Sequence, residues 1–213
     1  MCHNYGEHST QTSTSDAVTF TTNAISVDEL KALFTTHDPL TGLPARSLFL
    51  DRLEMTLATA DSAGTTCALL VLEVHPVLNE GSPLTQSAED EIVHAASNRL
   101  ASFVRRSDTL ARTGYMLFHM LVSNIRLDTD IHFIAQKILE LFDSPIDIAD
   151  KTITVRASLG ICAYPCDGGG AVLVKNATRA LELAKKAGAN EYRIFQKQWP
   201  VISSESKALV TVE

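Results

Sequence analysis

The sequence predicts an α/β fold in a single domain, because helical patterns alternate with apolar runs of strand length. Residues 66–74 (TCALLVLEV) form a continuous apolar run suited to the middle of a sheet. Residues 107–123 contain two strand-like runs around Gly114-Tyr115, which predict a hairpin because glycine tolerates the backbone angles of a tight turn. Residues 86–106 place apolar side chains at helical spacing and predict a long helix.

The other elements follow from similar patterns. Pro39, Gly42 and Pro44 punctuate a turn, after which apolar residues at 48, 49, 53 and 57 predict a helix. Further along, we expect an amphipathic helix at 128–142, two strands at 145–165 around a turn at Asp150-Lys151, a helix at 172–188 closed by Gly188, and a short last strand at 192–195.

The two ends of the chain differ from its middle. Residues 1–24 are rich in Ser and Thr and predict a flexible tail, and residues 197–213 predict a loosely ordered one. The folded domain is expected at 25–196. It begins with a helix at 26–36, too short to be stable alone, which would dock on the domain or pair with a second copy in a homodimer.

Composition limits the classes of function. The 213 residues are 45% hydrophobic and 20% charged, as in ordinary globular proteins, and the net charge of −7 argues against nucleic acid as a partner. No apolar run reaches the roughly 18 residues that span a bilayer, and the start lacks a secretory signal, so we expect a cytoplasmic chain without membrane insertion. The four cysteines show no metal pattern and are expected to be buried, reduced thiols.

Five fragments together resemble the GGDEF (diguanylate cyclase) family. They are HDPLTGLPAR (37–46), LVLEV (70–74), RRSDTLARTG (105–114), ASLGICAYP (157–165) and ALELAKKAGANEYRIF (180–195). They occur in the family's order over roughly 160 residues. The resemblance implies a central, mostly antiparallel sheet flanked by helices, similar to nucleotidyl cyclases and polymerase palms.

The hairpin that carries the family's name is degenerate here. Where the family has Gly-Gly-Asp/Glu-Glu-Phe, this chain has Gly114-Tyr115-Met116-Leu117-Phe118. The resemblance implies that the acidic pair binds metal and activates the 3′-hydroxyl of GTP. Met116 and Leu117 offer no oxygen ligand to Mg²⁺ and accept no proton, and Tyr115 is bulky where the backbone must approach the nucleotide. We therefore predict a pseudoenzyme with no catalytic residue and no metal.

Three side chains remain at positions that belong to the family's substrate site. Glu73 aligns with its first metal-binding Asp, Asp90 with a guanine contact and Lys185 with a phosphate contact. Each has a structural alternative. Glu73 could be a strand-end carboxylate facing water, Asp90 a first-turn residue capped through Ser87, and Lys185 a complement to a helix dipole.

Other positions of that site have changed. His75 replaces the second Asp of the strand, Ala189 replaces an Arg and Ala45 an Asn, while the guanine-reading Asn is absent. GTP binding without turnover is therefore the third hypothesis, behind the two given below. His75 and His119 show no metal spacing and are interpreted as structural.

Arg105 and Asp108 match the family's R-x-x-D inhibitory site, where cyclic di-GMP binds away from the catalytic centre. A guanidinium can stack on a purine or donate two hydrogen bonds to guanine, and a carboxylate can accept from its N–H edge. The alternative is a helix-terminal Arg pair favoured by the dipole, followed by an Asp that begins a strand. Arg126 and Lys137 are candidates for the second Arg that family members often use.

The sequence thus predicts a cyclic di-GMP receptor that needs no cofactor and is read out by an unidentified protein partner or by self-association. The alternative is a protein-interaction scaffold without nucleotide binding. Exposure of Tyr115, Met116 and Leu117 would favour the scaffold, since exposed apolar patches often mark contact sites.

Overall fold

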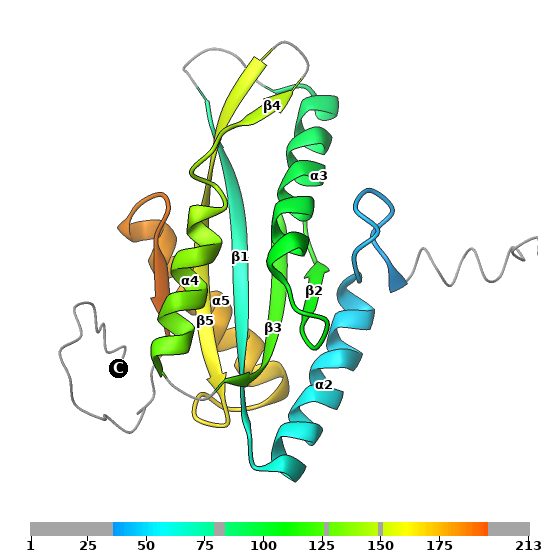
Figure 1. Ribbon diagram of the computed structural model, residues 1–213, viewed down its shortest axis with the longest axis vertical. Helices are drawn as coiled ribbons and strands as arrows, with labels where there is room; N and C mark the ends of the chain where they lie inside the picture. The colour runs from blue at the N-terminus through cyan, green and yellow to red at the C-terminus, as the bar shows by residue number, and fades with distance from the viewer. Residues whose placement is uncertain (1–35, 79–83, 126–127, 149–150, 196–213) are drawn as a thin grey trace, which may run out of the picture.

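A computed structural model of the protein describes residues 36–78, 84–125, 128–148 and 151–195 (Figure 1). Its elements are, in chain order, α2 (Arg46–Ala63), β1 (Thr66–Val77), α3 (Gln86–Phe103), β2 (Thr109–Arg112), β3 (Leu117–Ile125), α4 (Asp128–Glu140), β4 (Ile146–Ile148), β5 (Lys151–Tyr164), α5 (Gly170–Ala187) and β6 (Tyr192–Ile194). The predicted tails lie outside the described residues, as does the predicted leading helix at 26–36 except for Thr36.

The sheet has the order β2-β3-β1-β5-β4, and each of these neighbours is antiparallel to the next. Among the described strands, only β6, which lies beside β5, runs parallel to its neighbour. The predicted mixed α/β fold with a mostly antiparallel sheet is therefore confirmed. Strand β1 lies in the middle of the sheet, which explains why its sequence is a continuous apolar run.

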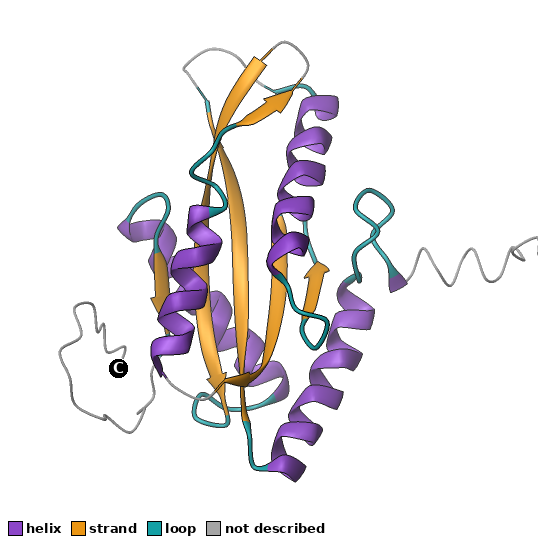
Figure 2. Cartoon of the chain, viewed as in Figure 1, coloured by secondary structure: helices purple, strands orange, loops and turns teal. Residues whose placement is uncertain are grey.

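Helices cover both faces of the sheet, as Figure 2 shows. Alternate residues of β1 point to opposite faces. Leu70 and Leu72 belong to a core with the apolar sides of α3 and α4, whereas Leu69 and Val71 belong to a second core with α2 and α5. The two cores fix the positions of the helices relative to the ends of β1 and β3.

Helix α5 packs directly on the backbone of β5 at Gly160. A Cβ atom there would lie 2.1 Å from both the Ala177 carbonyl oxygen and the Leu181 backbone nitrogen. Only a residue without a side chain permits this approach. The close contact brings the C-terminal part of α5, with Lys185, to the sheet beside β1.

Three expectations about local structure were wrong. The helix expected at 86–106 ends at Phe103, because Val104 has an extended backbone and the chain turns before β2. Lys151, expected in the turn between the two strands, already belongs to β5, while Asp150 lies outside the described residues. Cys67 and Cys162 are buried free thiols as expected, but Cys166 is exposed because it lies in the loop after β5.

No helix in the described part of the chain is long and apolar enough to cross a membrane.

Candidate functional site

The hairpin between β2 and β3 is held by an ion pair to the turn before α2. Nη1 of Arg112 lies 2.8 Å from Oδ2 of Asp38, and the two side chains are only 12% and 16% exposed. Arg112 also donates through Nε and Nη2 to the carbonyl oxygen of Tyr115, at 3.2 and 2.7 Å. Asp38 accepts two further bonds from the backbone and hydroxyl of Thr41. The turn thereby fixes the position of the hairpin tip.

The pKa of Asp38 reflects this environment. Burial on its own would raise that pKa, but the hydrogen bonds from Thr41 and Arg112 outweigh burial and hold it below its ordinary value. The carboxylate is therefore charged at neutral pH, as the ion pair requires.

The predicted hairpin is confirmed, and its tip is at Gly114-Tyr115. The backbone nitrogens of Thr113 and Gly114 donate to the Leu117 carbonyl, and the Val74 nitrogen donates to the Met116 carbonyl. The three side chains expected to form an exposed patch differ in exposure. Met116 is buried, Leu117 is half-buried and Tyr115 is 53% exposed.

Glu73 and Lys185, which the sequence suggested separately, contact each other. The Lys185 ammonium lies 2.9 Å from Oε2 of Glu73 and 3.3 Å from Oε1 of Glu182. The hydrogen bond to Glu73 is the main reason that the pKa of Lys185 is raised. Glu73 therefore does not simply face water, and Lys185 does more than complement the helix dipole. The two charges neutralise each other beside the cleft described below.

His75 continues this network toward the sheet. Its Nδ1 lies 3.6 Å from Oε1 of Glu73 and its Nε2 lies 3.2 Å from Oγ of Ser158. Burial lowers the pKa of His75, against the opposing effect of Glu73, so the ring is neutral at pH 7. The order Ser-His-Glu is that of a hydrolase triad, but Ser158 is 1% exposed in the middle of β5. A substrate could not reach this hydroxyl, so the arrangement is structural.

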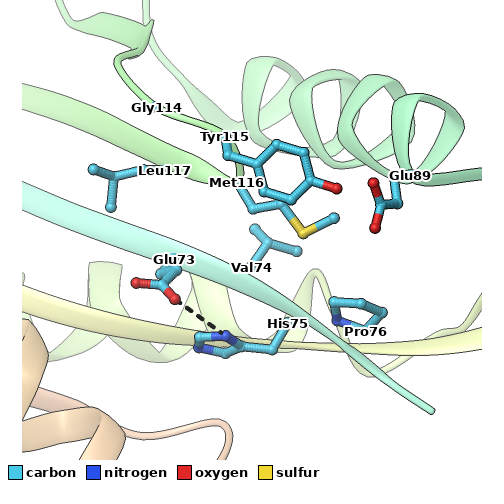
Figure 3. Close-up of a pocket in the computed structure, with 9 residues that line it drawn as sticks. All are labelled: Glu73, Val74, His75, Pro76, Glu89, Gly114, Tyr115, Met116 and Leu117. Carbon is cyan, nitrogen blue, oxygen red and sulfur yellow. Dashed lines mark ion pairs between the residues drawn. The ribbon is translucent and has the colours of Figure 1, made fainter. Parts of the chain in front are cut away.

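A cleft of about 540 Å³ opens where β3 begins and β1 continues past its last pairing with β3, at Glu73 and Leu117. Figure 3 shows Tyr115 and Met116 on one side of β1 and Glu73 and His75 on the other. The Tyr115 hydroxyl points to Glu89 of α3, and its hydrogen bond to that carboxylate raises the pKa of the phenol to about 12. The complete lining is Glu73, Val74, His75, Pro76, Glu89, Gly114, Tyr115, Met116 and Leu117.

Asp90 lies next to this cleft but does not line it. Its Oδ1 accepts a hydrogen bond of 3.0 Å from the side-chain amide of Gln86. The expected cap through Ser87 was wrong, since Thr85 is the N-cap of α3 and accepts from the Ala88 nitrogen. The cap lies two residues earlier because the helix begins at Gln86.

The R-x-x-D segment lies in the turn between α3 and β2. Arg105 and Arg106 are exposed and directly follow the C-cap Val104, so they lie just beyond the helix end where the structural alternative placed them. Oδ1 of Asp108 accepts bonds of 3.2 Å from the Ser123 backbone nitrogen and from the Ser107 hydroxyl. One carboxylate oxygen thus anchors the turn to β3, and no hydrogen bond to the other is found in the described part of the chain.

Of the two candidates for the second cation of the site, the structure describes Lys137 alone. Arg126 lies outside the described residues. Lys137 forms an ion pair of 2.6 Å with Glu140 and lies above the ring of Phe133. It is therefore engaged within its own helix.

His119 is a core residue. It is buried against Phe49, with 4.8 Å between ring centroids, and its Nδ1 lies 2.6 Å from the Thr113 hydroxyl. Burial lowers the pKa of His119 to about 4. The ring is therefore neutral at pH 7.

Metal binding has little support in this site. Among the described residues, no group of three or more His, Cys, Asp or Glu side chains could hold a metal ion. The hairpin offers the apolar side chains of Met116 and Leu117, and Glu73 is already paired with Lys185. These residues do not fit the Mg²⁺ that a cyclase requires, because that ion needs several oxygen ligands.

Two features missed by the sequence reasoning complete the site. The Asp38–Arg112 pair joins residues 74 positions apart, and Glu89 meets Tyr115 only across the cleft. Both partners of the ion pair stood in recognisable motifs, but nothing in either motif indicates the contact. Glu89 carries no sequence signal, because it is one of three successive acidic residues at 89–91.

A palm-like sheet with a β-hairpin beside the central strand is the architecture of nucleotidyl cyclase domains. Similarity to known protein families and solved structures leads to the same class. The family model described as "Diguanylate cyclase, GGDEF domain" matches residues 35–191. The chain therefore belongs to the GGDEF family.

Individual relatives come from bacterial signalling proteins. The bifunctional diguanylate cyclase/cyclic di-GMP phosphodiesterase MucR of Pseudomonas aeruginosa is 30% identical over 175 residues, which are 82% of this chain and 25% of MucR. The chain thus spans about a quarter of that relative. The GGDEF-domain structure of TpbB (YfiN) from the same species has a TM-score of 0.70 at 27% identity, covering 75% of this chain and 94% of that one.

A third neighbour shares the fold. The GGDEF domain of DgcB from Caulobacter crescentus, solved in complex with c-di-GMP, has a TM-score of 0.62 at 21% identity. It covers 75% of this chain and 93% of that one.

Proposed function

We propose that this chain is a catalytically inactive GGDEF domain that binds cyclic di-GMP through Arg105 and Asp108. It would act as a signalling module for a protein partner. The observation that carries the proposal is the contrast between two sites. The hairpin has lost its acidic ligands, whereas the R-x-x-D pair stands on an exposed turn in the register expected for the family.

The chemistry of the turn supports a guanine ligand. Arg105 is exposed, and no hydrogen bond or ion pair engages its guanidinium within the described part of the chain. Asp108 is held in place by Ser107 and Ser123 through Oδ1, which leaves Oδ2 to accept from the N–H edge of a base. An anchored carboxylate beside a free guanidinium offers an acceptor and a set of donors for the same base.

Calorimetric titration of cyclic di-GMP into the protein tests the proposal. Each charge-assisted hydrogen bond contributes about 1.5–3 kcal/mol, so Arg105→Ala should weaken binding by roughly ten- to hundredfold. Asp108→Asn should weaken it as well, because one acceptor oxygen becomes an amide. Arg179→Ala, an exposed arginine on α5, is the matched control and should leave binding unchanged.

Three results would count against this proposal. Binding that survives both substitutions would locate the ligand elsewhere. Absence of heat at high micromolar ligand would remove the receptor proposal. Formation of cyclic di-GMP from GTP and Mg²⁺ would contradict the inactivity on which the proposal rests.

A protein-interaction scaffold is the second candidate, and the exposure of Tyr115 favours it. A scaffold of this kind can be tested by measuring whether the protein self-associates. If sedimentation equilibrium detects a dimer that Tyr115→Ser dissociates, while cyclic di-GMP gives no heat, the scaffold becomes the better proposal. Met116 is buried, so an interaction through this tip would depend mainly on the phenol ring.

A further inference from the structure

The cleft beside the hairpin combines an aromatic ring, a carboxylate and apolar walls. The half-exposed ring of Tyr115 and the carboxylate of Glu89 stand at its mouth, and Met116, Val74 and Pro76 line the space below them (Figure 3). Its volume of about 540 Å³ lies within the range of small-molecule sites. Nothing in the proposed cyclic di-GMP site, which is on the turn before β2, uses these residues.

The charges around the cleft leave a negative excess. Within the described part of the chain, no lysine or arginine lines the cleft. The two nearby cations are paired elsewhere, Lys185 with Glu73 and Glu182 and Arg112 with Asp38. No ion pair to Glu89 is found among the described residues, and Asp90 adds a second carboxylate next to it.

We propose that this cleft binds an organic cation, an alkylammonium or guanidinium group with an apolar stem. The cation would lie against the face of Tyr115 and form an ion pair with Glu89. The stem would contact Met116, Val74 and Pro76. An aromatic face beside a carboxylate is a recurring environment for such cations, because the ring quadrupole and the carboxylate both attract positive charge.

The same geometry disfavours a nucleoside triphosphate. Phosphate groups need cations, backbone nests or a metal, and the cations here are already neutralised. The phenol of Tyr115 is protonated at neutral pH, as tyrosines ordinarily are, and its interaction with Glu89 raises its pKa further, so the ring carries no charge. The cleft therefore favours positively charged ligands, whereas a GTP site must favour a negatively charged one.

Such a group could come from a free small amine or from an arginine side chain of a protein. Calorimetric titration of the protein with one probe for each source distinguishes the two. The first probe is agmatine, a free amine with a guanidinium group. The second is the blocked tripeptide acetyl-Leu-Arg-Leu-amide, which represents an arginine side chain of a protein. Tighter binding of agmatine identifies a small amine, and tighter binding of the peptide identifies a protein partner. GTP, with and without Mg²⁺, is expected to give no heat.

Substitutions of Glu89 and Tyr115 test whether the probes bind in this cleft. Glu89→Gln should lower the affinity for whichever probe binds more tightly by about fivefold, as expected for the loss of an exposed ion pair near 1 kcal/mol. Tyr115→Leu should weaken it about threefold through loss of the cation–π contact. Glu91→Gln, an exposed carboxylate on the same helix outside the cleft lining, is the matched control.

The outcomes separate this site from the proposed receptor function. Arg105→Ala should leave cation binding unchanged, so either proposal can fail without the other. Affinity should fall as ionic strength rises. No saturable binding of either probe at millimolar concentration would overturn the proposal, as would equal binding by wild type and Glu89→Gln.

Discussion

Replacing Arg112 by alanine should destabilise the domain by about 2–3 kcal/mol. The substitution removes the ion pair with Asp38 and both hydrogen bonds to the Tyr115 carbonyl. Breaking a fully buried pair costs about 3–5 kcal/mol, because the remaining charge has no partner. Asp38 and Arg112 are 16% and 12% exposed, and Asp38 keeps its two bonds from Thr41, so the cost should fall below that range.

Urea denaturation followed by circular dichroism measures this change. With a slope of about 2 kcal/mol per molar urea, the midpoint should fall by roughly 1–1.5 M at pH 7. Arg52→Ala, an exposed arginine on α2, is the control and should shift the free energy of unfolding by less than about 0.5 kcal/mol. A loss for Arg112→Ala no larger than the control would refute the reasoning.

The pH dependence gives an independent check on the same pair. The pKa of Asp38 is lower in the folded state than in the unfolded chain, so its contribution is complete above the unfolded value. That contribution is lost as the pH falls through the folded value. The difference between wild type and Arg112→Ala should therefore be constant from pH 5 to 7 and shrink below about pH 4.

Three further predictions concern activity, packing and protonation. Incubation with GTP and Mg²⁺ should yield no cyclic di-GMP on chromatography, because the hairpin lacks ligands for the ion. Gly160→Ala should lower the free energy of unfolding by more than about 3 kcal/mol in urea titrations, since its Cβ would collide with the backbone of α5. His119 has a folded pKa of about 4, so the unfolded chain binds its proton at a higher pH and stability should fall as the pH drops from about 6.5 toward 4. His119→Asn should show a shallower slope over that interval, and an unchanged slope would exclude His119 as its source.

Periodicity and turn chemistry were enough to predict most elements of the fold. Strand β1 was recognisable because a strand buried on both faces leaves a continuous apolar run. The hairpin was recognisable from Gly114 between two apolar segments. The end of α3 was misjudged because Arg105 and Arg106 suit a helix equally well. What ends the helix is tertiary, since Asp108 binds the backbone of Ser123 in the neighbouring strand.

The candidate site was less accessible to sequence reasoning. The resemblance singled out Glu73 and Lys185, but their ion pair spans 112 positions and depends on α5 lying close to β5 at Gly160. Local spacing contains no information about such a contact. Glu89 was missed for a related reason, because its role depends on a tyrosine that reaches it from another element.

The hairpin retains its shape although its acidic residues are gone, and the interactions that hold it explain how. Its tip is fixed by the Arg112 bonds to Asp38 and to the Tyr115 carbonyl, and by the Val74 backbone bond to Met116. None of these bonds involves a side chain at the two acidic positions of the family motif. Burial of Met116 adds apolar contact where an acid would have to remain hydrated or bind metal. The hairpin therefore does not depend on the acidic pair for its shape.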